Sequence, residues 1–274
     1  MPLPNERLEG FIHHAAQYIA MLGQAYLPHK DDDSHSNMYW DVDRKALVGH
    51  RIEGPMNFRA AFFPSDFSLR LIDDDSLVRV TIKLSALSFE GGLASLRQRL
   101  GAMGYESQKL QPISHYEISA EPLASANQFE MPAQDLIEQW IYQRSEAQKA
   151  IEAVTQAAGY ETSAQTWPHH FDAGIYQSLE IAGKEGGHGL GLGWGIKDSV
   201  ANEPYFYAYI YQEKGQINYQ NLAPLNIGHW STGDWKGAYL GASEAFPAGT
   251  QDPQARIQAF LNEAKNALIA AVSV

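Results

Sequence analysis

The chain has 274 residues, of which 45% are apolar and 19% charged, and this composition is typical of a globular protein with one or two buried cores. A formal net charge of −12 argues against a nucleic acid partner and against anionic membrane surfaces. The chain has no cysteine, which excludes disulfides, thiolate metal sites and cysteine nucleophiles. We see no signal-peptide pattern and no apolar run long enough to span a membrane, so a cytoplasmic protein is expected.

The first half of the sequence predicts a helix, then antiparallel strands, then a second helix. Apolar residues recur at helical spacing from about 5 to 27 and again from Ser88 to about 103. Between them the period changes to two. The strands are expected at 37–42, 46–50, 56–62, 67–71 and 78–82, with a turn at 73–76.

The second half predicts the same order of elements. One helix begins at Pro132 and ends before Gly159, and another has Asp252 as its cap and Pro253 as its first residue. The strands expected between these helices are 167–180, 188–196, 204–212, 226–231 and 237–244.

These patterns predict an α+β protein of two similar halves, each consisting of a helix, an antiparallel sheet and a helix. We place the N-terminal half at 1–106, a connector rich in Ser, Gln, Pro and Ala at 107–131, and the C-terminal half at 132–274. The C-terminal half carries the residues that most suggest a ligand site.

Two regular tracks lie in the C-terminal half. Glycine occupies every second position from Gly189 to Gly195, and tyrosine occupies every second position from Tyr205 to Tyr211. If Gly195 faces Tyr205 in a hairpin, the remaining glycines face the remaining tyrosines in order. Glycine inside a strand often marks the close approach of a ligand or another group, and aromatic rings across the ladder can cover it. An aromatic face away from the helices is therefore expected, either as a ligand groove or as a surface covered by protein.

The segment WPHHFDAG, residues 167–174, has the strongest chemical character in the chain. On a strand, period two would send His169 to the core and leave His170 with Asp172 on the face of the glycine and tyrosine tracks. Imidazole and carboxylate at such spacing can converge on one proton or one metal ion. The alternative is that His170 and Asp172 form a hydrogen-bonded pair with a purely structural role.

A metal site at this place would need at least one further ligand. His188, at the start of the glycine strand, is the best candidate, so His170, Asp172 and His188 are the expected catalytic or divalent-metal residues. The spacing matches no established zinc motif, and no GxSxG motif supports a serine hydrolase. His13 and His14 lie on the first helix and are predicted to be on the surface.

The order of these segments resembles an uncharacterised bacterial family, a domain of unknown function of about this length. The resemblance runs from about 35 to 245 and rests on WPHHFDAG, the Gly-Trp strand and YFYAYIYQ. It implies shared positions for Phe171, Asp172, His188, Trp194, Tyr207 and Tyr209. His-His stands where the family has Gly-Ser, which gives Asp172 and His188 more weight. The resemblance implies no activity.

The sequence therefore favours small-molecule binding, with or without catalysis, on the open face of the second sheet. The expected ligand contacts are Tyr207, Tyr209, Trp194, Gly191 and Gly193, beside the His-Asp residues. One alternative is an interaction module or homodimer that uses the tyrosine face as its contact. A second alternative is a metal-dependent hydrolase.

Overall fold

The computed structural model describes residues 6–119, 123–183, 185–215, 217–249 and 252–273. These residues divide into two compact units. The N-terminal unit runs to Ser145 and also includes Thr166–Phe171, and the C-terminal unit comprises Glu146–Gln165 and the chain from Asp172 onward. The α+β class is confirmed, and the neighbouring strands within each unit pair antiparallel.

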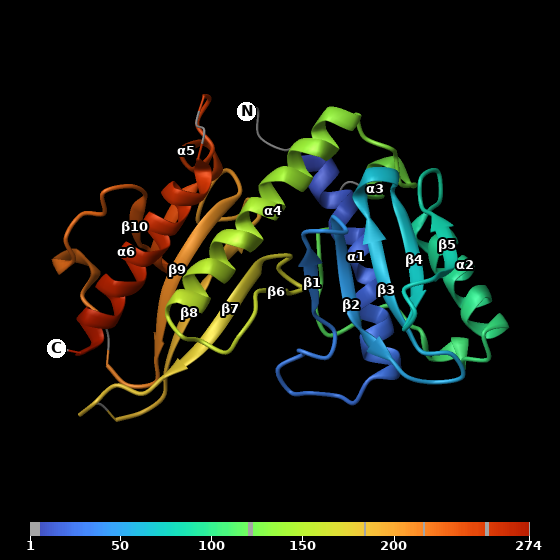
Figure 1. Ribbon diagram of the computed structural model, residues 1–274, viewed down its shortest axis with the longest axis horizontal. Coiled ribbons are helices and arrows are strands. Elements are labelled where there is room, and N and C mark those ends of the chain that lie inside the picture. Colours follow the sequence, from blue (N-terminus) through green and yellow to red (C-terminus); the bar gives the residue numbers. More distant parts are fainter. Residues whose placement is uncertain (1–5, 120–122, 184, 216, 250–251, 274) are drawn as a thin grey trace. The chain divides into compact units, whose positions relative to one another are not determined.

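The N-terminal unit is a sheet with the strand order β6-β1-β2-β3-β4-β5, against which α1 packs through β2 and β3 (Figure 1). Its elements are α1 (Glu6–Tyr26), β1 (Met38–Asp41), β2 (Ala46–Ile52), β3 (Phe58–Phe63), β4 (Ser68–Asp73), β5 (Val78–Lys83), α2 (Phe89–Ala102), α3 (Leu123–Ala126), the first part of α4 (Gln134–Ala157) and the end of β6 (Gln165–Thr166). The predicted helices, strands and turn of this half are confirmed.

Local chemistry explains how these elements begin and end. Ser88 caps α2, since its Oγ accepts a hydrogen bond of 3.0 Å from the Gly91 backbone N–H. In the turn after β4, the Ser76 N–H donates to the Asp73 carbonyl oxygen and the Leu77 N–H donates to the Asp73 side chain.

The segment expected to be a connector contributes to the core of the N-terminal unit. Phe129 is fully buried and contacts the rings of Phe11 and Phe67. Its backbone exchanges hydrogen bonds with Ala86 and Leu87. The division of the chain into 1–106, a connector at 107–131 and 132–274 stays a prediction.

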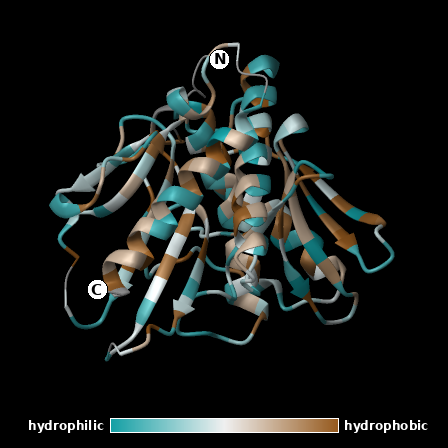
Figure 2. Cartoon of the chain, turned by 60° about the vertical axis from the view of Figure 1, so that its left-hand side comes forward, coloured by the Kyte–Doolittle hydropathy of each residue, from teal (hydrophilic) through white to brown (hydrophobic). Residues whose placement is uncertain are grey.

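The C-terminal unit is a sheet with the order β7-β8-β9-β11-β10, and α6 packs across β8 and β9 (Figure 1). Its elements are the second part of α4, β7 (Ala173–Leu179), β8 (His188–Gly195), β9 (Tyr205–Gln212), β10 (His229–Thr232), β11 (Lys236–Gly241), α5 (Ala242–Ala245) and α6 (Pro253–Ser273). Asp252 caps α6 as predicted, because its Oδ1 accepts from the Ala255 N–H at 3.0 Å. Hydrophobic and less hydrophobic residues alternate along the strands (Figure 2).

Both halves of the chain run from a helix through antiparallel strands to a helix, but the second half has β6–β11 where the first has β1–β5, and α5 precedes its last helix. That the two halves are also similar in three dimensions stays a prediction, because a common order of elements fixes neither the strand order nor the packing.

The predicted register of the glycine and tyrosine tracks is confirmed. Gly189, Gly191, Gly193 and Gly195 pair with Tyr211, Tyr209, Tyr207 and Tyr205. The alternate residues of β8 and β9 form the other face, where Trp194 packs against Phe206 and Phe246 with ring centroids 4.6 and 6.0 Å apart. The hairpin therefore has one core face and one face built from glycine and tyrosine.

Tyrosine rings fill the space that the glycines leave. A Cβ at Gly191 would lie 2.1 Å from Tyr209 Cε1, and one at Gly193 would lie 2.3 Å from Tyr207 Cζ. The Tyr207 ring passes over two strands, because its hydroxyl would also lie 2.4 Å from a Cβ at Gly174. The glycines thus allow the close approach of the protein's own aromatic rings.

Adding a methyl group at Gly193 should destabilise the fold far more than adding one at Gly195. The Gly193 Cβ would meet the Ala173 backbone oxygen at 2.6 Å as well as the Tyr207 ring, whereas the Gly195 Cβ would meet only the outer Tyr205 ring atoms, at 3.2 Å or more. We expect Gly193→Ala to lower the free energy of unfolding by about 2–3 kcal/mol and Gly195→Ala by less than about 1 kcal/mol. Urea unfolding measures both, and equal losses would contradict this packing.

Candidate functional site

The WPHHFDAG segment is a turn between two strands, so the predicted continuous strand at 167–180 is wrong in its first part. Residues 168–170 form the turn, in which the Phe171 N–H donates to the Trp167 carbonyl oxygen at 2.7 Å. Pro168 has no N–H to give to a ladder, which favours a turn over a strand interior. β7 begins only at Ala173.

Because residues 168–170 form a turn, the strand alternation used to predict the positions of His169 and His170 does not apply. His169 is half-buried and contacts the rings of Trp167, His170 and Tyr116, and His170 is exposed. His170 belongs to the N-terminal unit, whereas Asp172 belongs to the C-terminal unit. Strand periodicity therefore gives no reason to place these two side chains on one face.

Phe171 anchors the turn in the core of the N-terminal unit. Its φ of 56° is unusual for a residue with a side chain and costs of order 1–3 kcal/mol. Its fully buried ring offsets that cost: it stacks on His13 at 4.7 Å, lies 6.4 Å from Trp140, and lies under the Arg144 guanidinium at 5.6 Å.

The carbonyl oxygen of Pro168 ties the turn to α1. It accepts from His13 Nε2 at 2.7 Å and from Gln17 Nε2 at 2.8 Å. Because a carbonyl oxygen only accepts, the Nε2 of neutral His13 carries the proton. The turn covers this side of α1, and the expectation that His13 lies on the surface is therefore wrong: its exposed fraction is 7%.

Two titratable groups on adjacent turns of α1 have pKa values that are shifted in opposite directions. Burial raises the pKa of Glu9 to about 7, although a hydrogen bond from Trp140 and the charge of Arg144 oppose this shift. Burial lowers the pKa of His13 to about 4, against the effect of the Pro168 hydrogen bond. Burial therefore disfavours the charged form of both groups.

Asp172 and His188, the other two predicted catalytic residues, lie apart from each other in the C-terminal unit. Asp172, next to the start of β7, accepts a hydrogen bond of 2.5 Å from the Tyr207 hydroxyl. His188 pairs with Leu179 at the other end of β7, so about 20 Å of strand separates it from Asp172. Strand alternation also places His188 on the face of Leu190 rather than on the tyrosine face. The structure therefore does not bring Asp172 and His188 together.

The predicted ligand contacts are mostly covered. Trp194 lies in the core, and the rings of Tyr209 and Tyr207 cover Gly191 and Gly193. Burial raises the pKa of the Tyr207 hydroxyl well above its ordinary value, and the charge of Asp172 adds to this effect. The exposed tyrosines on this face are Tyr176 and Tyr211.

A cavity of about 410 Å³ lies in the N-terminal unit, and Gln17, which binds the Pro168 carbonyl oxygen of the turn, is part of its wall. Its apolar lining comes from α1, the start of α2 and the segment after α2, and consists of Met21, Phe89, Pro112, Ile113 and Ile118. Its polar lining consists of His14, Gln17, Tyr116 and Glu117. Ligand pockets have volumes of about 300–1,000 Å³, with apolar walls and a few polar groups.

Hydrogen bonds fix three polar groups of the cavity, those of His14, Gln17 and Tyr116. The Tyr116 hydroxyl donates to Gln17 Oε1 at 2.8 Å, and Gln17 is itself held by the Pro168 carbonyl. His14 Nδ1 lies 2.9 Å from the Gly10 carbonyl oxygen, so Nδ1 carries the proton. Burial lowers the pKa of His14 below its ordinary value of 6.5. The imidazole is therefore neutral at pH 7, and its Nε2 has a lone pair that can accept a proton or a hydrogen bond.

Sequence reasoning missed this cavity. His14 and Gln17 are three residues apart on one helix, so their common face could have been recognised. Tyr116 lies in the segment that was expected to be a connector, and no local pattern brings it to a helix 99 residues earlier in the chain.

Among the residues that the structure describes, no three His, Cys, Asp or Glu side chains gather as metal ligands would. Within those same residues, no helix is long and apolar enough to cross a membrane. Comparison of the chain with family models, with curated proteins and with solved structures found no match.

The opposite pKa shifts of Glu9 and His13 predict that pH affects the stability of the fold through these two groups in opposite directions. The folded-state pKa of Glu9 is raised from 4.5 to about 7. The contribution of Glu9 to the free energy of unfolding is therefore present below pH 4.5 and is lost as the pH rises to 7. The folded-state pKa of His13 is lowered from 6.5 to about 4, so its contribution is present above pH 6.5 and is lost as the pH falls to 4.

Relative to the parent protein, Glu9→Gln should gain unfolding free energy as the pH rises from 4.5 to 7. His13→Gln should gain it as the pH falls from 6.5 to 4, and each difference should reach about 3 kcal/mol. Urea unfolding across this range measures both profiles. Parallel pH profiles of the parent protein and the two variants would show that burial does not disfavour the charged form of either group.

Proposed function

We propose that the protein binds a small, largely apolar molecule that carries one hydrogen-bond donor, in the cavity lined by His14, Gln17 and Tyr116. The volume of the cavity, about 410 Å³ with a mainly apolar wall, is the observation that supports this proposal. The ligand chemistry follows from the polar groups: His14 Nε2 accepts, and the oxygen of Tyr116 can also accept because its proton is used by Gln17.

The proposal retains the small-molecule class expected from the sequence and assigns it to another place. On the tyrosine face the protein's own rings occupy the space over the glycines. In the cavity the apolar wall and the polar acceptors are accompanied by open volume, which a ligand requires.

The donor requirement can be tested with two probes of similar shape, 2-naphthol and naphthalene. We expect 2-naphthol to bind more tightly, by about three- to tenfold, because a net hydrogen bond contributes about 0.5–1.5 kcal/mol. His14→Phe should reduce this preference, since phenylalanine keeps a ring but lacks the acceptor, and only the Tyr116 oxygen is left to accept. Fluorescence titration of 2-naphthol, and competition with naphthalene, measure the two affinities.

A matched histidine control and a blocking variant complete this test. His29→Phe changes an exposed histidine outside the cavity and should leave both affinities unchanged. Ile113→Trp should prevent binding of both probes, because the larger side chain fills the cavity. Binding that survives Ile113→Trp would refute the assignment of the cavity.

A further inference from the structure

The N-terminal sheet has a second face with its own chemistry. Gly49 of β2 faces α1, because a Cβ there would lie 2.5 Å from Ile19 Cγ2. Strand alternation therefore points Val48 to the opposite face. There Val48 and Ala61 form a buried apolar floor, against which Tyr39 and Ile72 pack.

Two arginines on this face lie directly opposite each other. In the register of β2 and β3, Arg51 pairs with Arg59. Like charges at opposite positions of an antiparallel ladder destabilise it unless another group compensates them.

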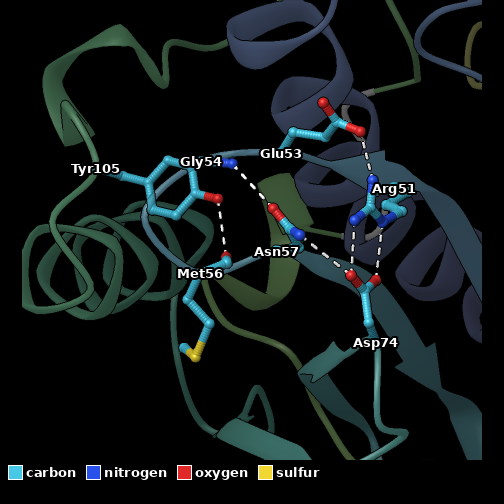
Figure 3. Close-up of polar contacts among 7 residues, drawn as sticks. All are labelled: Arg51, Glu53, Gly54, Met56, Asn57, Asp74 and Tyr105. Carbon is cyan, nitrogen blue, oxygen red and sulfur yellow. Dashed lines mark hydrogen bonds and ion pairs between the residues drawn. The ribbon is translucent and has the colours of Figure 1, made fainter.

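The charge of Arg51 is compensated. Its Nε and Nη2 donate to the two carboxylate oxygens of Asp74 at 2.8 and 2.6 Å, and its Nη1 donates to Glu53 (Figure 3). Asn57 Nδ2 also donates to Asp74 at 3.1 Å. Hydrogen bonds from Arg51 and Asn57 hold the pKa of Asp74 at about 2, so this carboxylate stays charged and bound.

The charge of Arg59 has no such partner. Its Nη1 donates to the Gly49 carbonyl oxygen at 3.2 Å, and within the described residues it forms no ion pair. Its neighbour Arg44 is paired with Asp41 at 2.6 Å. Arg59 is thus the guanidinium on this face that has unused donors and no ion pair, although the charge of the nearby Asp74 carboxylate also attracts it.

These groups line a cavity of about 200 Å³. The guanidinium groups of Arg44, Arg51 and Arg59 line it together with Tyr39, Val48 and Ile72. Its carboxylates are Asp74, bound to Arg51, and Asp73, bound to Arg79. With the ion-pair partners Asp41, Glu53 and Arg79 included, the charges around this cavity balance, although the whole chain carries −12.

We propose that this cavity is a binding site for a small organic anion, independent of the cavity beside His14. The anionic group, a carboxylate or a phosphate, binds the guanidinium of Arg59, whose planar donors match two oxygens of either group. The apolar part of the ligand lies on Val48 and Ile72, beside the Tyr39 ring.

Nuclear magnetic resonance of the full chain can test this proposal, with the Nε–Hε signal of Arg59 as the readout. Titration with benzoate, and separately with inorganic phosphate, distinguishes the two chemistries. We expect benzoate to shift the Arg59 signal saturably, and phosphate to do so more weakly because it leaves the apolar floor uncovered. A stronger response to phosphate would also support the site and would assign it to phosphate chemistry. If neither anion shifts the signal, the proposal is overturned.

Substitutions separate the site from a general effect of charge. With binding followed on the signals of Val48 and Ile72, Arg59→Gln should weaken it by about tenfold or more, and Arg59→Lys should weaken it less. Arg99→Gln removes the same charge from an exposed position of α2 and should change nothing. Equal weakening by Arg59→Gln and Arg99→Gln would overturn the proposal, and thermal melting shows whether each variant is folded. His14→Phe should leave benzoate binding intact, so the two cavities are tested independently.

Discussion

The N-terminal unit depends on the carbonyl oxygen of Pro168, which accepts from both His13 and Gln17. The first of these hydrogen bonds sets the tautomer of a buried histidine. The second holds Gln17, which in turn fixes Tyr116 at the wall of the larger cavity. Proline favours a turn here because it has no N–H to donate to a ladder, and in the turn its carbonyl oxygen accepts from side chains.

The same turn explains why α1 carries polar groups on a buried face. Glu9, His13 and Gln17 recur at intervals of four residues and lie under the turn and the nearby aromatic rings. Each of them is buried with a hydrogen-bond partner, which is the condition under which polar side chains are tolerated inside a protein. His14, one position from His13, points to the cavity instead. Adjacent residues of one helix therefore serve the core and a candidate binding site.

In the C-terminal unit, the tyrosine rings of β9 pack on the glycines of β8. Tyr207 reaches Asp172 only because Gly193 and Gly174 have no side chains beneath its ring. The aromatic surface replaces the missing side chains, which recovers burial that a glycine-rich strand would otherwise lack. A regular track of glycines is therefore weak evidence for a ligand groove when an equally regular aromatic track lies on the next strand.

The sequence by itself determined the helices, most of the strands and the pairing of β8 with β9, because periods of 3.6 and 2 and local capping are properties of neighbouring residues. It could also identify WPHHFDAG as unusual, but only the tertiary structure decided that Pro168–His170 forms a turn and where each histidine points. His13 looked exposed on its helix and is buried by a turn 155 residues away. The two cavities likewise join segments distant in sequence, and burial, pKa and open volume depend on such contacts, which no local pattern records.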